Sequence, residues 1–264
     1  MDDTTLNPRM ERFTHEHSRR LLSLYIVYTF VLVAVYDLSA SVIHRINQNA
    51  RVTTFFTVGA LLFYGVVFSF MIKQMRLPLR IFGFSMENWK PKLFWTVIYS
   101  ILFCLFMLLV KYIIITYATQ FQTFPLFDFD LKDLDHFAIS TQHRISFSLW
   151  LISAIFYCIF VPVQAYIIHG AIQSPLLHLL SFKNRGMVSI LVTSLVFGAL
   201  HIDLHIVYAL SVIVPAVFWT WLFARQDSLF TVSISHMIIG LWAFWGLGFQ
   251  HIFFTWSVTV IHLF

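Results

Sequence analysis

Three histidines and one glutamine lie inside strongly apolar segments of this sequence, where polar side chains are costly in a membrane. Gln164 and His169 stand five positions apart in FVPVQAYIIHG, residues 160–170. His201 follows VFGAL, and His236 follows SLFTVSIS. A buried imidazole can ligate zinc, act as a general base or donate a hydrogen bond to an oxyanion, so these residues are the candidates for chemistry.

The histidines must lie at a similar depth if they form one site. His169 precedes Lys183 by 14 residues, and His201 follows Arg185 by 16 residues. At 1.5 Å per residue, both lie roughly 20–25 Å from the loop that carries the two basic residues. His236 comes only nine residues after the preceding acidic residue, so it fits this level only if its helix starts deeper. The sequence therefore predicts that His169 and His201 meet, and leaves the place of His236 open.

The elements that position these residues must be membrane helices. Of 264 residues, 59% are hydrophobic and 11% are charged, whereas a soluble domain has about 25% charged residues. Such a chain cannot cover its apolar surface with polar side chains, so its solvent must be lipid. The composition predicts an all-α, polytopic membrane protein in a lipid bilayer. The net charge of +5 lies in short loops and gives no reason to expect nucleic-acid binding.

Seven apolar stretches are long enough to span a bilayer as helices, which takes about 20 residues each. The last stretch, 252–264, is short for a span and would be an eighth, tilted or half-buried helix. We therefore predict a transmembrane helical bundle of seven or eight spans, a single domain over 21–264 after a polar tail, 1–20. The seven stretches are 21–43, 52–72, 93–118, 146–169, 187–202, 206–224 and 229–249.

Basic residues indicate the orientation, because cytoplasmic loops are enriched in lysine and arginine. They fall in four segments, which land on one side if the spans alternate. We therefore place the N-terminus and these loops in the cytoplasm, with the protein in the cytoplasmic or an equivalent inner membrane. The basic residues are Arg9, Arg12, Arg19 and Arg20, then Lys73, Arg76, Arg80, Lys90 and Lys92, then Lys183 and Arg185, and finally Arg225.

Two charged residues lie within predicted spans, Asp37 in the first and Lys111 in the third. Both spans start on the same side of the membrane, and the two residues reach a similar depth of about 24–27 Å. We expect either a structural ion pair between them or independent snorkelling of each side chain to water.

Three short motifs occur in order along the second half of the chain: QAYIIHG at 164–170, FGALH at 197–201 and HMIIG at 236–240. This pattern resembles the CPBP family of CAAX prenyl endopeptidases and bacteriocin-processing enzymes. That family carries Glu-Glu-x-x-x-Arg, Phe-x-x-x-His and His-x-x-x-Asn (or a small polar residue) on successive core helices. LPLRIFGF, residues 77–84, resembles the loop before the family's core. The resemblance implies a CAAX-protease-like core over roughly 75–250.

The resemblance also implies a role for each motif position. In the family, the first glutamate, aided by a histidine, activates a water to attack a peptide carbonyl, and the arginine orients the glutamates. The second histidine and the asparagine stabilise the oxyanion. Aligned residue by residue, the glutamates fall on Gln164 and Ala165, the arginine on His169, the catalytic histidines on His201 and His236, and two substrate-binding positions on Phe197 and Gly240.

Three departures from this pattern argue against peptide hydrolysis. A glutamine amide has no basic lone pair at neutral pH, so Gln164 cannot accept a proton from water as a carboxylate does. Loss of a general base costs about 10²- to 10⁴-fold in rate, and Ala165 and Gly240 remove two further polar groups. We therefore predict a catalytically impaired CPBP-type protein without a cofactor. Its partner would be a transmembrane helix or a lipidated peptide.

Two other functions stay open at this stage. One is an active endopeptidase with a rebuilt zinc site and a metal-bound hydroxide as nucleophile, because three histidines plus a water is a catalytic zinc arrangement. The other is a transporter or channel whose path is lined by the histidines and Asp37, although the chain lacks the internal repeats typical of transporters. The zinc ligands would be His169, His201, His205 and His236.

Overall fold

The computed structural model describes residues 16–46, 50–75, 78–127, 147–179, 183–202 and 206–249. Within these ranges the chain forms helices and short connections, with no strand, which confirms the predicted all-α class. The longer helices are α2 (Glu16–Ile46), α3 (Ala50–Met75), α4 (Trp89–Tyr117), α5 (Phe147–Ala165), α7 (Arg185–Ala199), α8 (Ile206–Gln226) and α9 (Leu229–Leu241). The shorter ones are η2 (Leu79–Phe82), η3 (Thr119–Phe121), η5 (Tyr166–Gln173), α6 (Ser174–Leu179) and η6 (Trp242–Gly246).

Several helices of the described part identify an integral membrane protein by their length and apolar composition. Helix α7 is 15 residues long and covers about 22 Å, less than the hydrocarbon core of about 30 Å. The count of seven or eight spans therefore stays a prediction, and its last element, 252–264, lies outside the described residues. Four segments of the described part can cross a membrane: Trp89–Tyr117, Leu151–His178, Ile206–Gln226 and Leu229–Gly246.

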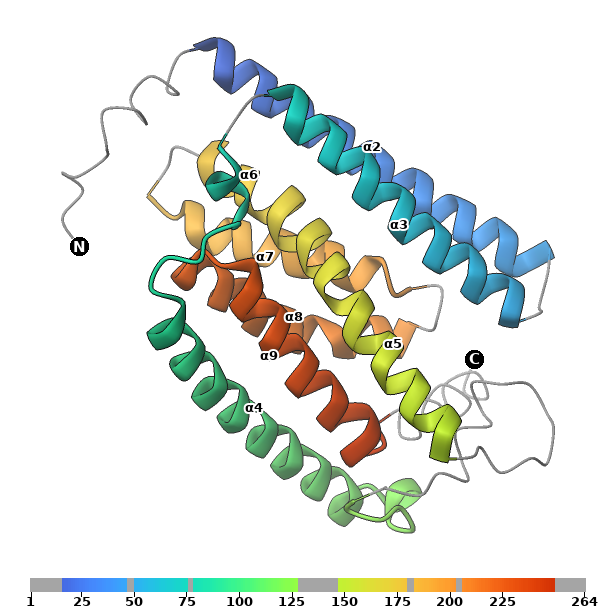
Figure 1. The fold of residues 1–264 in the computed structure, drawn as a ribbon. Helices are drawn as coiled ribbons and strands as arrows, with labels where there is room; N and C mark the ends of the chain where they lie inside the picture. Colours follow the sequence, from blue (N-terminus) through green and yellow to red (C-terminus); the bar gives the residue numbers. More distant parts are fainter. Residues whose placement is uncertain are drawn as a thin grey trace.

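Helix α9 lies inside the bundle, between α4 on one side and α5 on the other (Figure 1). Helix α8 packs against both α7 and α9. The pair α2 and α3 packs beyond α5, on the side away from α4 (Figure 1). Because α9 carries His236, the candidate site lies within the bundle and is enclosed by α5, α7 and α8.

Helix α4 has the inverted polarity of a helix whose solvent is lipid. Large apolar side chains on its outer face are exposed, whereas Thr96 and Ser100 are buried. Thr96 Oγ1 donates a hydrogen bond to Gln226 Oε1 (2.9 Å), and Ser100 Oγ donates to Ser235 Oγ (2.8 Å). Hydrogen bonds of this kind hold neighbouring helices together in lipid. The polar face of α4 therefore fixes α9 at the residue next to His236.

Lys111 is buried near the other end of α4, with 1% of its surface exposed. Its Nζ donates a hydrogen bond to the backbone carbonyl of Leu247. The lysine therefore does not snorkel to water as predicted. Helix α2, which carries Asp37, lies on the opposite side of the bundle from α4 (Figure 1). The side chain of Asp37 lies outside those that the structure describes, so its predicted ion pair with Lys111 stays a prediction.

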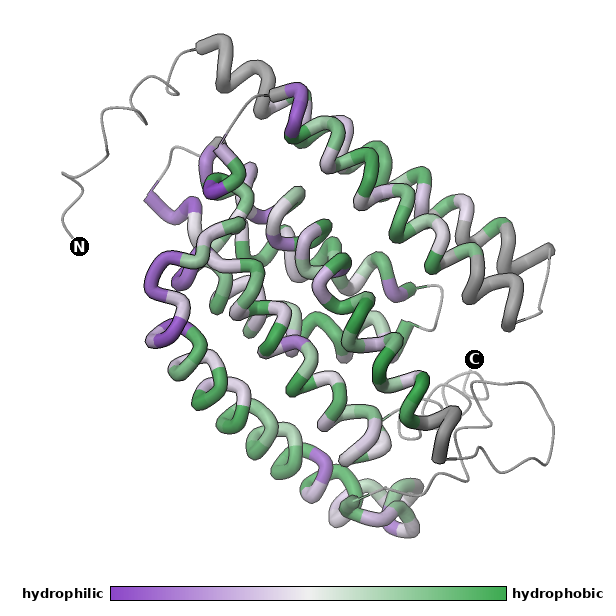
Figure 2. Tube along the Cα trace, in the orientation of Figure 1, coloured by the Kyte–Doolittle hydropathy of each residue, from purple (hydrophilic) through white to green (hydrophobic). Residues whose placement is uncertain are grey.

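Hydrophilic residues gather at one end of the bundle, around the loop between α3 and α4 and at the start of α7 (Figure 2). This arrangement brings the basic segments after the N-terminal tail to a common end, as the sequence predicts. The predicted tail, 1–20, lies outside the described part as far as residue 15, and α2 begins at Glu16.

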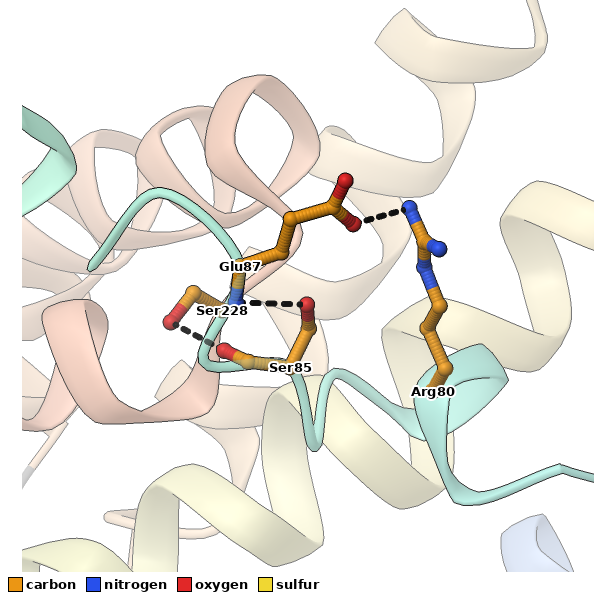
Figure 3. Close-up of polar contacts among 4 residues, drawn as sticks. All are labelled: Arg80, Ser85, Glu87 and Ser228. Carbon is orange, nitrogen blue, oxygen red and sulfur yellow. Dashed lines mark hydrogen bonds and ion pairs between the residues drawn. The ribbon is translucent and has the colours of Figure 1, made fainter.

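The loop between α3 and α4 determines where α9 begins. After η2, Gly83 has a left-handed φ of 81°, which glycine adopts without a steric penalty. Its carbonyl accepts a hydrogen bond from the Leu229 N–H at 3.0 Å, and Ser228 Oγ donates to the Ser85 carbonyl at 3.4 Å (Figure 3). The first turn of α9 is therefore buried against this loop, since Leu229 is 7% exposed.

Candidate functional site

The first motif lies where helix α5 changes its hydrogen-bond pattern. Helix α5 contains Pro162, which has no N–H to donate. After Ala165 the chain continues as the π-helix η5, and the Ser174 N–H donates to the His169 carbonyl five residues earlier. Because π-helical turns are rare and occur often at functional sites, this segment is a candidate site on its geometry alone.

The two positions aligned with the family's glutamates have different surroundings. Gln164 is partly exposed, whereas Ala165 is 1% exposed. Gln164 stands seven residues after Tyr157, so the two share one face of α5, the helix that packs against α9. A glutamate would therefore fit at position 164 with little rearrangement, whereas at position 165 it would displace packed neighbours.

His169 occupies the arginine position of the first motif and takes part in a buried hydrogen-bond chain. Its Nδ1 lies 2.8 Å from Gln173 Oε1, and Gln173 Nε2 donates to the Thr220 carbonyl on α8 at 2.6 Å. Because Gln173 uses its amide hydrogen toward Thr220, its oxygen faces the histidine, and His169 carries its hydrogen on Nδ1. The imidazole thus joins η5 to α8 and keeps the Nε2 lone pair.

His201 ends the second motif in a similar tautomer. Its Nδ1 lies 2.7 Å from the Phe197 carbonyl, which can only accept a hydrogen bond, so the ring hydrogen is on Nδ1. The His201 ring also contacts the Phe197 ring (centroids 4.6 Å apart) and the Tyr208 ring (5.7 Å). The side chain is held by its own helix, and its Nε2 lone pair remains available to a ligand.

His236 joins the second and third motifs. Its ring stacks on Trp219 with centroids 3.8 Å apart and an interplanar angle of 27°. Phe197 lies 5.9 Å from the same imidazole, in an edge arrangement. The Phe197 ring thus contacts both His201 and His236.

The asparagine position of the third motif is filled by a side chain from another helix. A Cβ atom on Gly240 would overlap the Tyr157 hydroxyl and lie 2.5 Å from Tyr157 Cζ. The hydroxyl instead reaches past the glycine and donates to the His236 carbonyl at 3.4 Å. Gly240 is thus a packing partner of Tyr157.

The described residues do not form a ligand set for the zinc site that the alternative function requires. No group of three His, Cys, Asp or Glu side chains in that part of the chain is placed so that it could hold a metal. His205, one of the four predicted ligands, lies outside the described residues, as does Asp203. A zinc site that includes His205 therefore stays a prediction.

Sequence reasoning missed Gln173, Tyr157 and Trp219. Gln173 follows His169 by four residues, a spacing at which helical side chains meet, so this partner could have been found. Tyr157 could have been found from its position two turns before Gln164 on the same face. Trp219 has no such signal, because only the packing of α8 against α9 distinguishes it from Trp221.

The helical bundle and its three convergent motifs define an integral membrane protein with a protease-like core. Residues 144–242, a little over a third of the chain, match a protein-family model described as "Rce1-like: Type II CAAX prenyl endopeptidase Rce1-like". This segment contains all three motifs, so the resemblance to the CPBP family is confirmed over it, and the protein is CAAX-protease-like there. No curated protein and no solved structure matches the chain.

Proposed function

We propose that this protein is a catalytically impaired CPBP-type membrane protein that binds a transmembrane helix or a lipidated peptide without cleaving it. One observation carries the proposal. Among the side chains that the structure describes, no carboxylate lies beside His201 or His236, whereas Glu87 and Asp227 lie in the loops at the polar end. The family's hydrolysis requires a carboxylate to accept a proton from water, and the aligned Gln164 cannot do so.

The histidines do not replace the missing carboxylate. His201 keeps a free Nε2, but its Nδ1–H faces the neutral Phe197 carbonyl. In a serine-protease triad, by contrast, an aspartate at this position stabilises the imidazolium that proton transfer creates. His169 likewise donates its Nδ1–H to a neutral group, the side-chain amide oxygen of Gln173. The site is therefore better equipped to hold a partner by hydrogen bonds than to move a proton.

The test uses a fluorescent farnesylated peptide with a CAAX-type C-terminus and the purified full-length protein in micelles. We expect saturable binding by fluorescence anisotropy and an intact peptide by mass spectrometry. The same peptide without the farnesyl group is the matched control and should bind at least tenfold more weakly, because a buried lipid contributes about 0.8 kcal/mol per CH₂. His201→Ala should retain binding within a few-fold if its fold persists.

Three results would count against this proposal. The first is cleavage by the unmodified protein that His201→Ala abolishes. The second is stoichiometric zinc whose removal by a chelator abolishes cleavage, which would favour the active zinc endopeptidase. The third is the absence of binding by both peptides.

We also propose that the polar end of the bundle faces the cytoplasm, with the protein in the cytoplasmic or an equivalent inner membrane, because basic loops favour that side. Arg80 is exposed at this end. Arg80→Cys, in a background without Cys104 and Cys158, should therefore react with a membrane-impermeant maleimide in inverted vesicles and stay unlabelled in intact cells. The reverse pattern would overturn the orientation.

A further inference from the structure

The described part of the chain contains two buried indole N–H donors without an acceptor, and one of them, that of Trp219, lies beside His236. Trp219 Nε1 and Trp245 Nε1 are both buried and have no hydrogen-bond partner among the described residues. Trp219 as a whole is 4% exposed. Buried donors in native proteins are nearly always paired, with the protein itself, water or a ligand. Among the described residues the Trp219 donor, which lies beside His236, is therefore left open to an acceptor that a bound partner can supply.

The motif residues around Trp219 cannot supply this acceptor. Trp219 stacks face to face with His236, and an indole N–H lies in the plane of its own ring, so it does not point at the imidazole nitrogens. Phe197, whose ring centroid is 5.9 Å from that of Trp219, carries no side-chain acceptor. The Trp219 donor is thus adjacent to the second and third motifs and satisfied by neither.

The second donor belongs to a different element. Trp245 lies on η6, and its ring centroid is 5.5 Å from that of Tyr157. Tyr157 in turn lies 6.2 Å from His236. The two unpaired indole N–H groups thus belong to different elements, α8 and η6, and Tyr157 contacts both the Trp245 ring and the His236 ring.

A peptide group matches this set of donors and acceptors. Its carbonyl oxygen accepts a hydrogen bond from an indole N–H, and its own N–H can donate to a carbonyl oxygen or an imidazole nitrogen. A peptide group is neutral, so it enters an apolar interior without the cost of burying an unpaired charge. A carboxylate ligand would incur that cost.

We propose that Trp219 is a ligand-binding residue whose indole N–H donates a hydrogen bond to a peptide carbonyl oxygen of the bound partner, beside His236. This inference rests on the proposed function, because it names the chemical group of the partner that the site holds. The partner's main chain, and not only its lipid or its side chains, is then recognised in the bundle.

The first test observes the donor itself with a small probe, N-methylacetamide, which mimics one peptide group. The full-length protein carries eight tryptophans, and ¹⁵N labelling gives each indole N–H its own resonance, with that of Trp219 assigned by Trp219→Phe. We expect the Trp219 resonance to move downfield and to saturate as the probe is added. Trp221, two residues away on the same helix, is the internal control and should not move.

The second test removes only the N–H. Site-specific incorporation of 3-benzothienylalanine at position 219 keeps the shape and stacking of tryptophan and replaces the nitrogen with sulfur. We expect affinity for the farnesylated peptide to fall about 5- to 10-fold, as for the loss of one buried hydrogen bond, with no decrease in the unfolding midpoint. The same replacement at position 221 should leave affinity unchanged.

The outcomes separate the two proposals. A Trp219 resonance that does not respond to N-methylacetamide, or a position-219 isostere that binds the peptide as tightly as the unmodified protein, overturns the carbonyl site and leaves the proposed function standing. If the unmodified protein fails to bind the peptide but its Trp219 resonance still saturates with N-methylacetamide, the lipidated-peptide proposal falls and the carbonyl site stands.

Discussion

Replacing Gln164 by glutamate is expected to produce peptide cleavage, with a rate at least about 10²-fold above that of the unmodified protein. Glutamate has the shape of glutamine, and the position is partly exposed, so the carboxylate can be hydrated by the water that it activates. His201 already has a free Nε2, and the Phe197 ring contacts both the His201 ring and the His236 ring. The substitution therefore restores the carboxylate that would act as general base, while Ala165 and Gly240 remain as departures from the family's pattern.

The measurement is mass spectrometry of the farnesylated peptide after incubation with equal amounts of each variant. Gln122→Glu is the matched control, because Gln122 is exposed beyond the end of α4, and it should not cleave. His201→Ala added to Gln164→Glu should abolish the gain. Ala165→Glu should increase cleavage less than Gln164→Glu does, and it should lower the unfolding midpoint, because Ala165 is buried. A folded Gln164→Glu variant that binds the peptide and leaves it intact would show that more than a carboxylate is missing.

The second large effect is expected at Gly240, where alanine should lower the free energy of unfolding by about 1–3 kcal/mol. The added methyl group would overlap the Tyr157 hydroxyl and crowd the ring carbon that bears it. Because Tyr157 also contacts the His236, Phe244 and Trp245 rings, its displacement would disturb the packing on both sides. Asparagine, the family's residue at this position, should be at least as damaging.

A double-mutant cycle checks this expectation by denaturant unfolding in micelles. Tyr157→Leu should be destabilising alone, but adding Gly240→Ala to it should cost little, so that the two substitutions couple by about 1 kcal/mol or more. Gly59→Ala is the control, since a Cβ there meets no atom within 4 Å and alanine favours a helix. Additive effects of Tyr157→Leu and Gly240→Ala would contradict the packing that we describe.

The helices that could be predicted from sequence are those defined by long apolar stretches. The predicted spans 93–118 and 206–224 correspond closely to Trp89–Tyr117 and Ile206–Gln226. The span predicted at 146–169 instead continues as a π-helix through Gln173 and then as α6. Apolar length sets how far a helix can cross lipid, but it contains no signal for a change from i→i−4 to i→i−5 hydrogen bonds.

The candidate site could be predicted in part, because depth follows from counting residues along a helix. This reasoning predicts that His169 and His201 lie near one level, and it leaves the place of His236 open. The start of α9 depends on a hydrogen bond to Gly83, about 150 residues before His236, which no local pattern indicates. Trp219 and Tyr157 join the site through helix packing alone.

The loop that receives the start of α9 also carries the ion pair between Arg80 and Glu87, 2.7 Å long (Figure 3). If α9 began one residue earlier or later, His236 would turn by about 100° and move by about 1.5 Å, which would end its stack on Trp219. An insertion or deletion in this surface loop would therefore act on the buried histidines much as a mutation among them does. Variation in loop length between related chains would then alter what their interiors can bind, even where every motif residue is retained.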